Sequence, residues 1–174
     1  MDKKTAVVTG AGEGIGRAIS RRLAKDGFHV YVTDMILEKA EATVQLIEQD
    51  GGAATACEMN VLNETQIAAV VDLVKKTDGH LDVWCNNAGV SSMGRVWDMT
   101  EHDWDFNMDI NAKGVFMCTK GFIKLMMEQR HGKIINTASI ASLRADPMLS
   151  CYCASKWAVA GFTRTCAREL GPYG

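Results

Sequence analysis

Short runs of apolar and β-branched residues alternate with longer helical patterns along almost the whole chain. The runs predict strands over residues 5–9, 29–34, 53–59, 81–85 and 132–137. The helical patterns predict helices over about residues 15–25, 37–49, 64–76, 101–129 and 150–170. Strands that are separated by helices pair in parallel, and strands that are apolar on both faces need a helical layer on each side. The alternation therefore predicts an α/β fold with a doubly wound parallel sheet.

The amino-acid composition narrows the class of protein further. The chain has 174 residues, which matches one domain, and 47% of them are apolar and 23% charged, as in globular proteins. Nineteen basic residues against 21 acidic ones give a net charge of −2, so we expect no nucleic-acid partner. No apolar run reaches the roughly 18 residues that span a bilayer, and the start of the chain, Met1–Thr5, lacks the apolar core of a signal peptide. We therefore expect no membrane partner and a cytoplasmic location.

The six cysteines do not form a metal-binding pattern. No two of them have C-x-x-C spacing, and the four histidines are scattered along the sequence. A zinc site is therefore not expected. Cysteines in such an arrangement stay reduced in the cytosol, and we expect most of them to be buried thiols.

A glycine-rich segment follows the first predicted strand and opens the first predicted helix. It reads Thr9-Gly10-Ala11-Gly12-Glu13-Gly14-Ile15-Gly16. Glycines let the backbone turn tightly and approach a pyrophosphate, which then rests on the free N–H groups of the helix N-terminus. This context predicts a dinucleotide-binding loop, and a plain tight turn is the alternative. The expected cofactor contacts come from Gly10, Glu13, Gly14, Ile15 and Gly16.

Asp34 ends the second predicted strand, 20 residues after Gly14. A carboxylate at this place accepts hydrogen bonds from the ribose hydroxyls of an adenosine and repels a 2′-phosphate. Glu13 adds a second negative charge within the glycine-rich loop. The two acidic residues therefore predict NAD as the cofactor, with NADP disfavoured. The alternative is that both are solvated surface charges.

Tyr152 and Lys156 stand four residues apart at the start of the last predicted helix and so share one of its faces. A free phenol, with a pKa of about 10, is a poor base at neutral pH. A nearby ammonium group favours the phenolate, and such a pair is able to remove a hydroxyl proton while a hydride leaves the same carbon. Ser139 follows the fifth predicted strand, where its hydroxyl is placed to hydrogen-bond the reacting oxygen. Ser142 is a nearby alternative to Ser139.

The motifs occur along the chain in a characteristic order. They are Thr9-Gly10-x-x-x-Gly14-x-Gly16, Asn86-Asn87-Ala88-Gly89, Asn111, Ser139 and Tyr152-x-x-x-Lys156. Together they resemble the short-chain dehydrogenase/reductase family, and the resemblance extends over the whole chain. It implies a Rossmann-like doubly wound fold and NAD(P)-dependent oxidoreductase activity. Residues 1–174 would then form a single dinucleotide-binding domain.

The resemblance also implies roles for individual residues. Tyr152 would be the general acid/base, and Ser139 would position and polarise the substrate oxygen. Lys156 would hold the nicotinamide ribose and tune Tyr152, while Asn111 would help to hold a water molecule in a proton relay. The cofactor would be lined, and the central strand steadied, by Asn87, Ala88 and Gly89.

Two departures from the family pattern are visible in the sequence. Many relatives carry Asp-Val at the end of the third strand, where the acid meets adenine, and this chain has Asn60-Val61, whose amide both accepts and donates. Relatives also continue beyond the last predicted helix with a further strand, a lid over the substrate and a final strand. The present sequence stops at Gly174, so we expect the fold to be incomplete at its C-terminal end and to lack the substrate lid.

These observations predict an NAD-dependent oxidoreductase that interconverts a secondary alcohol and a ketone. The substrate would be a polyol, a diol or a hydroxyacyl compound, and the catalytic residues would be Asn111, Ser139, Tyr152 and Lys156. No metal would be needed. The resemblance further implies a homodimer or homotetramer, formed through the long helix and the tyrosine helix. The alternative is a catalytically incomplete dinucleotide-binding fragment without turnover.

Overall fold

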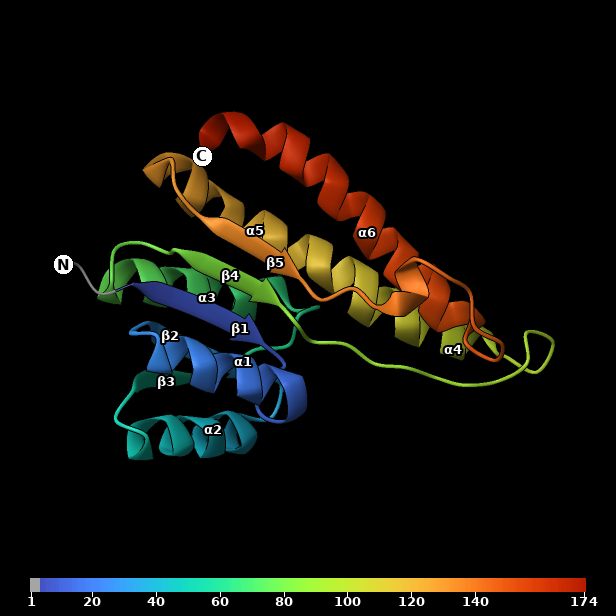
Figure 1. Cartoon of the computed structure of the whole chain (residues 1–174), viewed down its shortest axis with the longest axis horizontal. Coiled ribbons are helices and arrows are strands. Elements are labelled where there is room, and N and C mark those ends of the chain that lie inside the picture. The colour runs from blue at the N-terminus through green and yellow to red at the C-terminus, as the bar shows by residue number, and fades with distance from the viewer. Residues whose placement is uncertain (1–3) are drawn as a thin grey trace.

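Residues 4–174 are described by a computed structural model, and residues 1–3, part of the start on which the expectation of no signal peptide rests, lie outside it. The strands of the described chain are β1 (Thr5–Thr9), β2 (His29–Asp34), β3 (Ala53–Glu58), β4 (Val83–Asn86) and β5 (Lys133–Asn136). They form a parallel sheet in the order β3-β2-β1-β4-β5 (Figure 1). The order changes direction at β1, as expected for the doubly wound topology.

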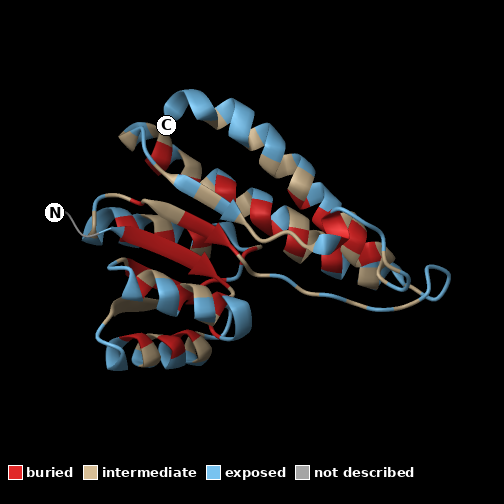
Figure 2. Cartoon of the chain, in the orientation of Figure 1, coloured by how far each residue is buried: buried red, intermediate tan, exposed pale blue. Residues whose placement is uncertain are grey.

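Helices cover both faces of this sheet, as predicted. The helical segments are α1 (Gly14–Lys25), α2 (Leu37–Gln49), α3 (Glu64–Thr77), α4 (Glu101–Asn107), the π-helical segment η1 (Met108–Lys113), α5 (Gly114–Gln129), η2 (Ile140–Ser142), α6 (Ser150–Leu170) and η3 (Gly171–Tyr173). One apolar core joins β1 and β2 to α1 and α2, and a second joins β1, β2 and β4 to α3 and α5. Both faces of the central strands are therefore buried, whereas the edge strand β5 is partly exposed (Figure 2).

The long helix that the sequence predicts over residues 101–129 is divided by the π-helical segment η1 into α4 and α5. Helical backbone runs through Gly114, the first residue of α5. A Cβ on Gly114 would stand 2.7 Å from Val61 Cγ2, and one on Gly121 would stand 2.6 Å from Ile67 Cγ2. These two glycines therefore allow α5 to pack closely on its neighbours, which explains glycine inside a helix.

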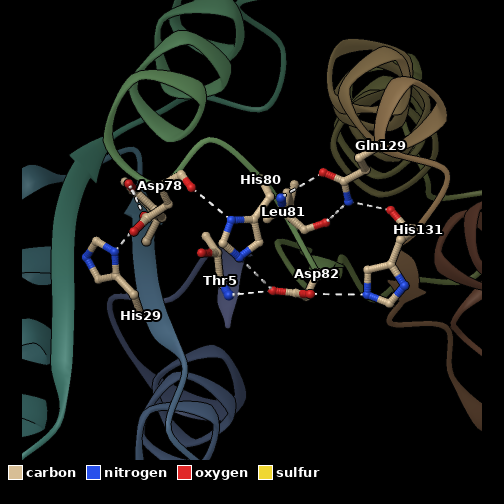
Figure 3. Close-up of polar contacts among 9 residues, drawn as sticks. Thr5, His29, Asp78, His80, Leu81, Asp82, Gln129 and His131 are labelled. Carbon is tan, nitrogen blue, oxygen red and sulfur yellow. Dashed lines mark hydrogen bonds and ion pairs between the residues drawn. The ribbon is translucent and has the colours of Figure 1, made fainter. Parts of the chain in front are cut away.

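A polar network closes the edge of the sheet at which the strands begin (Figure 3). The Asp82 carboxylate accepts the Thr5 N–H at 2.7 Å and pairs with His131 at 3.1 Å. On the neighbouring strand, His29 Nδ1 lies 2.7 Å from Asp78 Oδ2. Main-chain N–H groups at the start of a strand need an acceptor when they are buried, and the Asp82 carboxylate satisfies that of Thr5. The network lies at the opposite end of the strands from the ligand-binding edge.

The sequence also predicts that no segment spans a membrane and that most cysteines are buried. Among residues 4–174, no helix is both long and apolar enough to cross a bilayer. The expected burial of the cysteines is confirmed for Cys57, Cys85, Cys118, Cys151 and Cys153, while Cys166 is partly exposed. Burial raises the pKa of the Cys57 and Cys85 thiols to about 11, so both stay protonated at neutral pH.

Candidate active site

A cleft of about 740 Å³ opens where the strands end, at the edge of the sheet that binds ligands in doubly wound folds. It is lined by residues of the loops that follow all five strands and by the start of α6. The sequence-predicted residues on its wall are Gly10, Glu13, Ile15, Gly16, Asp34, Asn60, Val61, Asn87, Ala88, Gly89, Ser139, Tyr152 and Lys156. Gly14 and Asn111 are predicted site residues that do not line it.

The glycine-rich loop packs against the end of β4 so closely that two of its residues have no room for a side chain. Gly10 has a φ of +58°, and a Cβ there would stand 2.8 Å from Ala88 Cα. A Cβ on Gly16 would stand 2.2 Å from the Gly10 carbonyl oxygen. Asn87 holds the same loop by donating from Nδ2 to the Thr9 and Gly10 carbonyls. This close packing requires glycine at both positions, and it leaves the main chain of Gly10 and Gly16 uncovered by side chains at the cleft.

The first turn of α1 is suited to bind a phosphate. Glu13 precedes this helix in extended conformation, and its side chain makes no capping hydrogen bond. The first N–H groups of a helix have no partners within the helix, and they carry the positive end of its dipole. Free N–H groups at the start of α1, beside the glycines that line the cleft, suit the pyrophosphate of a dinucleotide. Gly14, with a φ of +54°, makes the left-handed turn into this helix and acts through backbone shape.

Asp34 occupies the end of β2 as predicted, and its carboxylate is held by the main chain. Oδ2 accepts the Gly12 N–H at 3.0 Å, and Oδ1 accepts the Ile36 N–H at 3.1 Å. The side chain is buried but lines the cleft. A Cβ on Gly12 would stand 2.7 Å from Asp34 Oδ2, so this second glycine of the loop, which is not a fixed position of the Thr9-Gly10-x-x-x-Gly14-x-Gly16 motif, keeps room for the carboxylate.

Lys39 is a residue of the cleft wall that sequence reasoning missed. Its Nζ lies 2.9 Å from Glu13 Oε2, and this contact lowers the pKa of Glu13. The negative charge that the sequence assigns to Glu13 is therefore paired with a cation. No local signal marks Lys39, because it stands in the first turn of a polar surface helix and meets Glu13 only in the folded chain.

Asn60 lines the cleft beyond β3. Its side-chain oxygen accepts the Leu62 N–H at 2.9 Å, and its main-chain N–H donates to the side chain of Gln66. The asparagine therefore shapes its own turn. Val61 is buried beside Gly114 and contributes an apolar wall.

Lys156 is a buried cationic residue on the wall of the cleft. The side chain is only 4% exposed, and burial lowers its pKa from the ordinary value. Nζ donates to the Thr137 carbonyl oxygen at 2.8 Å and stands 5.7 Å from the centroid of the Tyr152 ring. The i, i+4 spacing on α6 thus brings the ammonium and the phenol together, as the sequence predicts.

Ser139 precedes the short helix η2, and Ser142 is the last residue of that helix. Ser139 lines the cleft, and its Oγ accepts the Ala141 N–H at 3.1 Å. Ser142 is buried and donates its hydroxyl proton to the Ser139 carbonyl oxygen. Of the two alternatives, it is Ser139 whose hydroxyl is accessible to a ligand.

Asn111 lies in the π-helical segment η1 and is completely buried. Its side-chain oxygen accepts the Val90 N–H at 2.8 Å, and its Nδ2 donates to the Val90 carbonyl and to Ser155 Oγ, both at 2.9 Å. Both of its N–H donors are therefore used to tie the loop after β4 to α6. Isolated π-helical turns are frequent at functional sites. A Cβ on Gly89 would stand 3.1 Å from Asn111 Oδ1, so this glycine permits the contact.

Known proteins share this sequence and architecture. The family model for short chain dehydrogenases matches residues 4–174. The 3-oxoacyl-[acyl-carrier-protein] reductase FabG of Staphylococcus aureus is 40% identical over 172 residues, which cover 98% of this chain and 70% of that protein. A short-chain dehydrogenase/reductase of Armillaria gallica is 37% identical over 174 residues, covering 98% of this chain and 67% of that protein.

A solved structure extends the comparison to three dimensions. The crystal structure of a metagenomic short-chain oxidoreductase in complex with NADP matches with a TM-score of 0.92 at 34% identity, and the match covers 98% of this chain and 77% of the other. The resemblance on which the expected fold and chemistry depend is thereby confirmed. The chain belongs to the short-chain dehydrogenase family of oxidoreductases, whose members bind a nicotinamide dinucleotide.

Proposed function

We propose that this chain interconverts a secondary alcohol and a ketone, with Tyr152 as the general acid/base. The observation that supports this most directly is the presence of Tyr152, Lys156 and Ser139 in one cleft with the glycine-rich loop. A nicotinamide dinucleotide bound along that loop would supply or accept the hydride. The dinucleotide would be held by the first turn of α1, by Asp34 and by Asn87-Ala88-Gly89.

The proton is handled by the chain's own side chains. In the direction of ketone reduction, the Tyr152 hydroxyl gives its proton to the carbonyl oxygen as that carbon is reduced, and Tyr152 becomes a phenolate. The buried Lys156 ammonium stabilises this negative charge. Ser139 donates a hydrogen bond to the same oxygen and so fixes its position. Asn111 holds the loop after β4 and the start of α6 in register, and we propose that its neighbourhood also supports the water of a proton relay.

We propose NAD as the preferred cofactor because of Asp34. Its two oxygens are held by main-chain N–H groups, so the carboxylate cannot turn away from a 2′-phosphate. The similar metagenomic enzyme was crystallised with NADP, which makes NADP the competing candidate. The selectivity test in the Discussion distinguishes the two.

We propose a 3-oxoacyl or hydroxyacyl compound as the substrate. The loops after β4 and β5, whose first residues line the cleft, carry exposed apolar residues further along, and main-chain pairing of Gly94 with Met148 and Leu149 holds the two loops together. Apolar side chains in this place suit an acyl chain better than a polyol. The residues are Met93, Val96, Trp97, Leu143 and Met148. The 3-oxoacyl-[acyl-carrier-protein] reductases among the relatives support the same choice.

We further propose that the chain forms a homodimer or homotetramer through α4, α5 and α6. These helices expose large aromatic side chains, which water disfavours and a subunit contact would cover. The aromatic residues are Trp104, Phe116 and Trp157. Light scattering coupled to size-exclusion chromatography measures the mass, and a monomer at micromolar concentration would contradict this assembly.

The proposed function is tested by separating binding from turnover. Fluorescence titration with NADH and NADPH measures binding, and the oxidation of the reduced cofactor is then followed with a 3-oxoacyl thioester, acetoin and a keto sugar. Turnover that is largest with the thioester is the expected result. Binding without turnover of any ketone would instead favour a catalytically incomplete fragment.

A further inference from the structure

The end of the cleft that adjoins β2 holds three charged side chains that differ in how firmly they are fixed. Asp34 is buried and accepts two main-chain hydrogen bonds. Glu13 is exposed, Lys39 is partly exposed, and the two side chains pair with each other at 2.9 Å. The Asp34 carboxylate is therefore fixed in place, whereas the Glu13 and Lys39 side chains are able to turn toward a ligand because a largely exposed ion pair is weak.

Lys39 lies next to Asp34, across Gly12. The point at which a Gly12 Cβ would stand is 2.5 Å from Lys39 Cβ and 2.7 Å from Asp34 Oδ2. The flexible side chain of Lys39 begins beside Gly12 and brings its ammonium group to Glu13, the next residue of the loop. The ammonium group thus belongs to the same end of the cleft as the carboxylate that is proposed to meet the adenosine ribose.

We infer that the Glu13–Lys39 ion pair controls how strongly this chain rejects a 2′-phosphate. Lys39 is a latent ligand for the phosphate, and Glu13 opposes it in two ways. It occupies the ammonium group, and it repels the phosphate directly. The inference rests on the proposed function, because it assigns the adenosine end of the dinucleotide to this part of the cleft. It also makes Glu13 a specificity residue that acts largely through Lys39.

The neighbouring cation does not take over this role. Arg17 Nε donates to Thr43 Oγ1 at 3.0 Å, and its guanidinium also donates to the Gly12 carbonyl oxygen. These bonds direct Arg17 along α1 and toward α2. The described wall of the cleft has two cationic side chains, Lys39 and Lys156, and of these it is Lys39 that lies beside Asp34.

The test is a double-mutant cycle with Glu13→Gln, Lys39→Met and the combination of both. The dissociation constants of NADH and NADPH are measured by fluorescence, and those of AMP and adenosine 2′,5′-bisphosphate by calorimetry at low and high salt. Glu128→Gln is the matched control, since the Glu128 side chain is as exposed as that of Glu13 and pairs with Lys75, between α3 and α5. This control changes the net charge by the same amount as Glu13→Gln.

In the wild-type background, Glu13→Gln is expected to improve the affinity for NADPH and for adenosine 2′,5′-bisphosphate by about tenfold, relative to the ligands that lack the 2′-phosphate. High salt should reduce this improvement. In the Lys39→Met background the improvement should fall below about threefold, because direct repulsion alone remains. Equal gains in both backgrounds, no gain at all, or the same gain with Glu128→Gln would overturn the inference while leaving the proposed function intact. Failure of the wild type to bind either dinucleotide would overturn both.

Discussion

The ammonium group of Lys156 donates a hydrogen bond to the main-chain carbonyl of Thr137, with 2.8 Å between Nζ and O. Thr137 follows β5 and Lys156 lies in the second turn of α6, so the bond joins two segments that both line the cleft. It fixes a buried charge beside the Tyr152 ring. The acid/base pair is therefore positioned by the main chain of the sheet as well as by helix geometry.

Replacing Tyr152 by phenylalanine removes the hydroxyl that exchanges the proton. We expect turnover to fall by about 10²–10⁴-fold, the usual contribution of a general acid/base. The affinity for NADH should stay within about threefold, because the aromatic ring and its packing remain. Steady-state assays and fluorescence titration measure the two quantities, and strong residual turnover would remove Tyr152 from the mechanism.

Lys156→Met tests the buried charge through the pH dependence of stability. Burial lowers the pKa of Lys156 below its ordinary value of 10.5, so the folded state binds fewer protons than the unfolded state between the lowered value and 10.5. The free energy of unfolding of the wild type, relative to the variant, should therefore rise with pH through that window. Urea unfolding at several pH values from about 7 to about 10.5 measures this difference. A difference that is independent of pH would contradict the buried ammonium.

Asp34→Asn removes a charge and nearly preserves the side-chain shape. If Asp34 rejects the 2′-phosphate, the ratio of kcat/KM for NADH to that for NADPH should fall by about tenfold. Asp50→Asn is the control, because Asp50 is exposed and pairs with Arg21 outside the cleft. Unchanged selectivity in Asp34→Asn would rule out this residue as the selector and favour NADP.

Two glycines that differ in their surroundings should respond oppositely to alanine. In Gly16→Ala the new Cβ meets the Gly10 carbonyl oxygen, which must move, so we expect a loss of about 1–3 kcal/mol in the free energy of unfolding and weaker NADH binding. Gly161, within α6, has nothing within 4 Å of the added Cβ. Gly161→Ala should stabilise the chain by about 0.5–1 kcal/mol because alanine favours helix. Chemical denaturation measures both, and a loss in Gly161→Ala similar to that in Gly16→Ala would refute the steric argument.

The polar network at the start of the strands is expected to contribute to stability and not to binding. Asp82→Ala leaves the Thr5 N–H without its acceptor and should cost about 1–3 kcal/mol of unfolding free energy. His131→Ala removes a more exposed partner of the same carboxylate and should cost less than about 1 kcal/mol. NADH affinity should change less than about twofold in both, since the cleft lies at the other end of the strands. Equal costs for the two variants would show that the main-chain contact is unimportant.

Much of the fold was predictable because its signals are local. Apolar runs and glycine turns located every strand to within two residues, and Asn63 caps α3 by accepting the N–H groups of Thr65 and Gln66. The start of β4 was the least accurate boundary. Leu81 and Asp82 read as strand, but their main-chain groups bond to Gln129 and Thr5. Such partners, far along the chain, leave no mark in the local pattern.

The sequence by itself determined the doubly wound sheet, the glycine-rich loop and the pairing of Tyr152 with Lys156, because periodicity and i, i+4 spacing are properties of neighbouring residues. Tertiary structure decided which atoms those residues contact. It separated Ser139 from Ser142, enclosed Asn111 in a π-helical turn and set Lys39 against Glu13. Each of these outcomes depends on segments that meet only when the chain is folded, and their geometry cannot be derived from the spacing of residues along it.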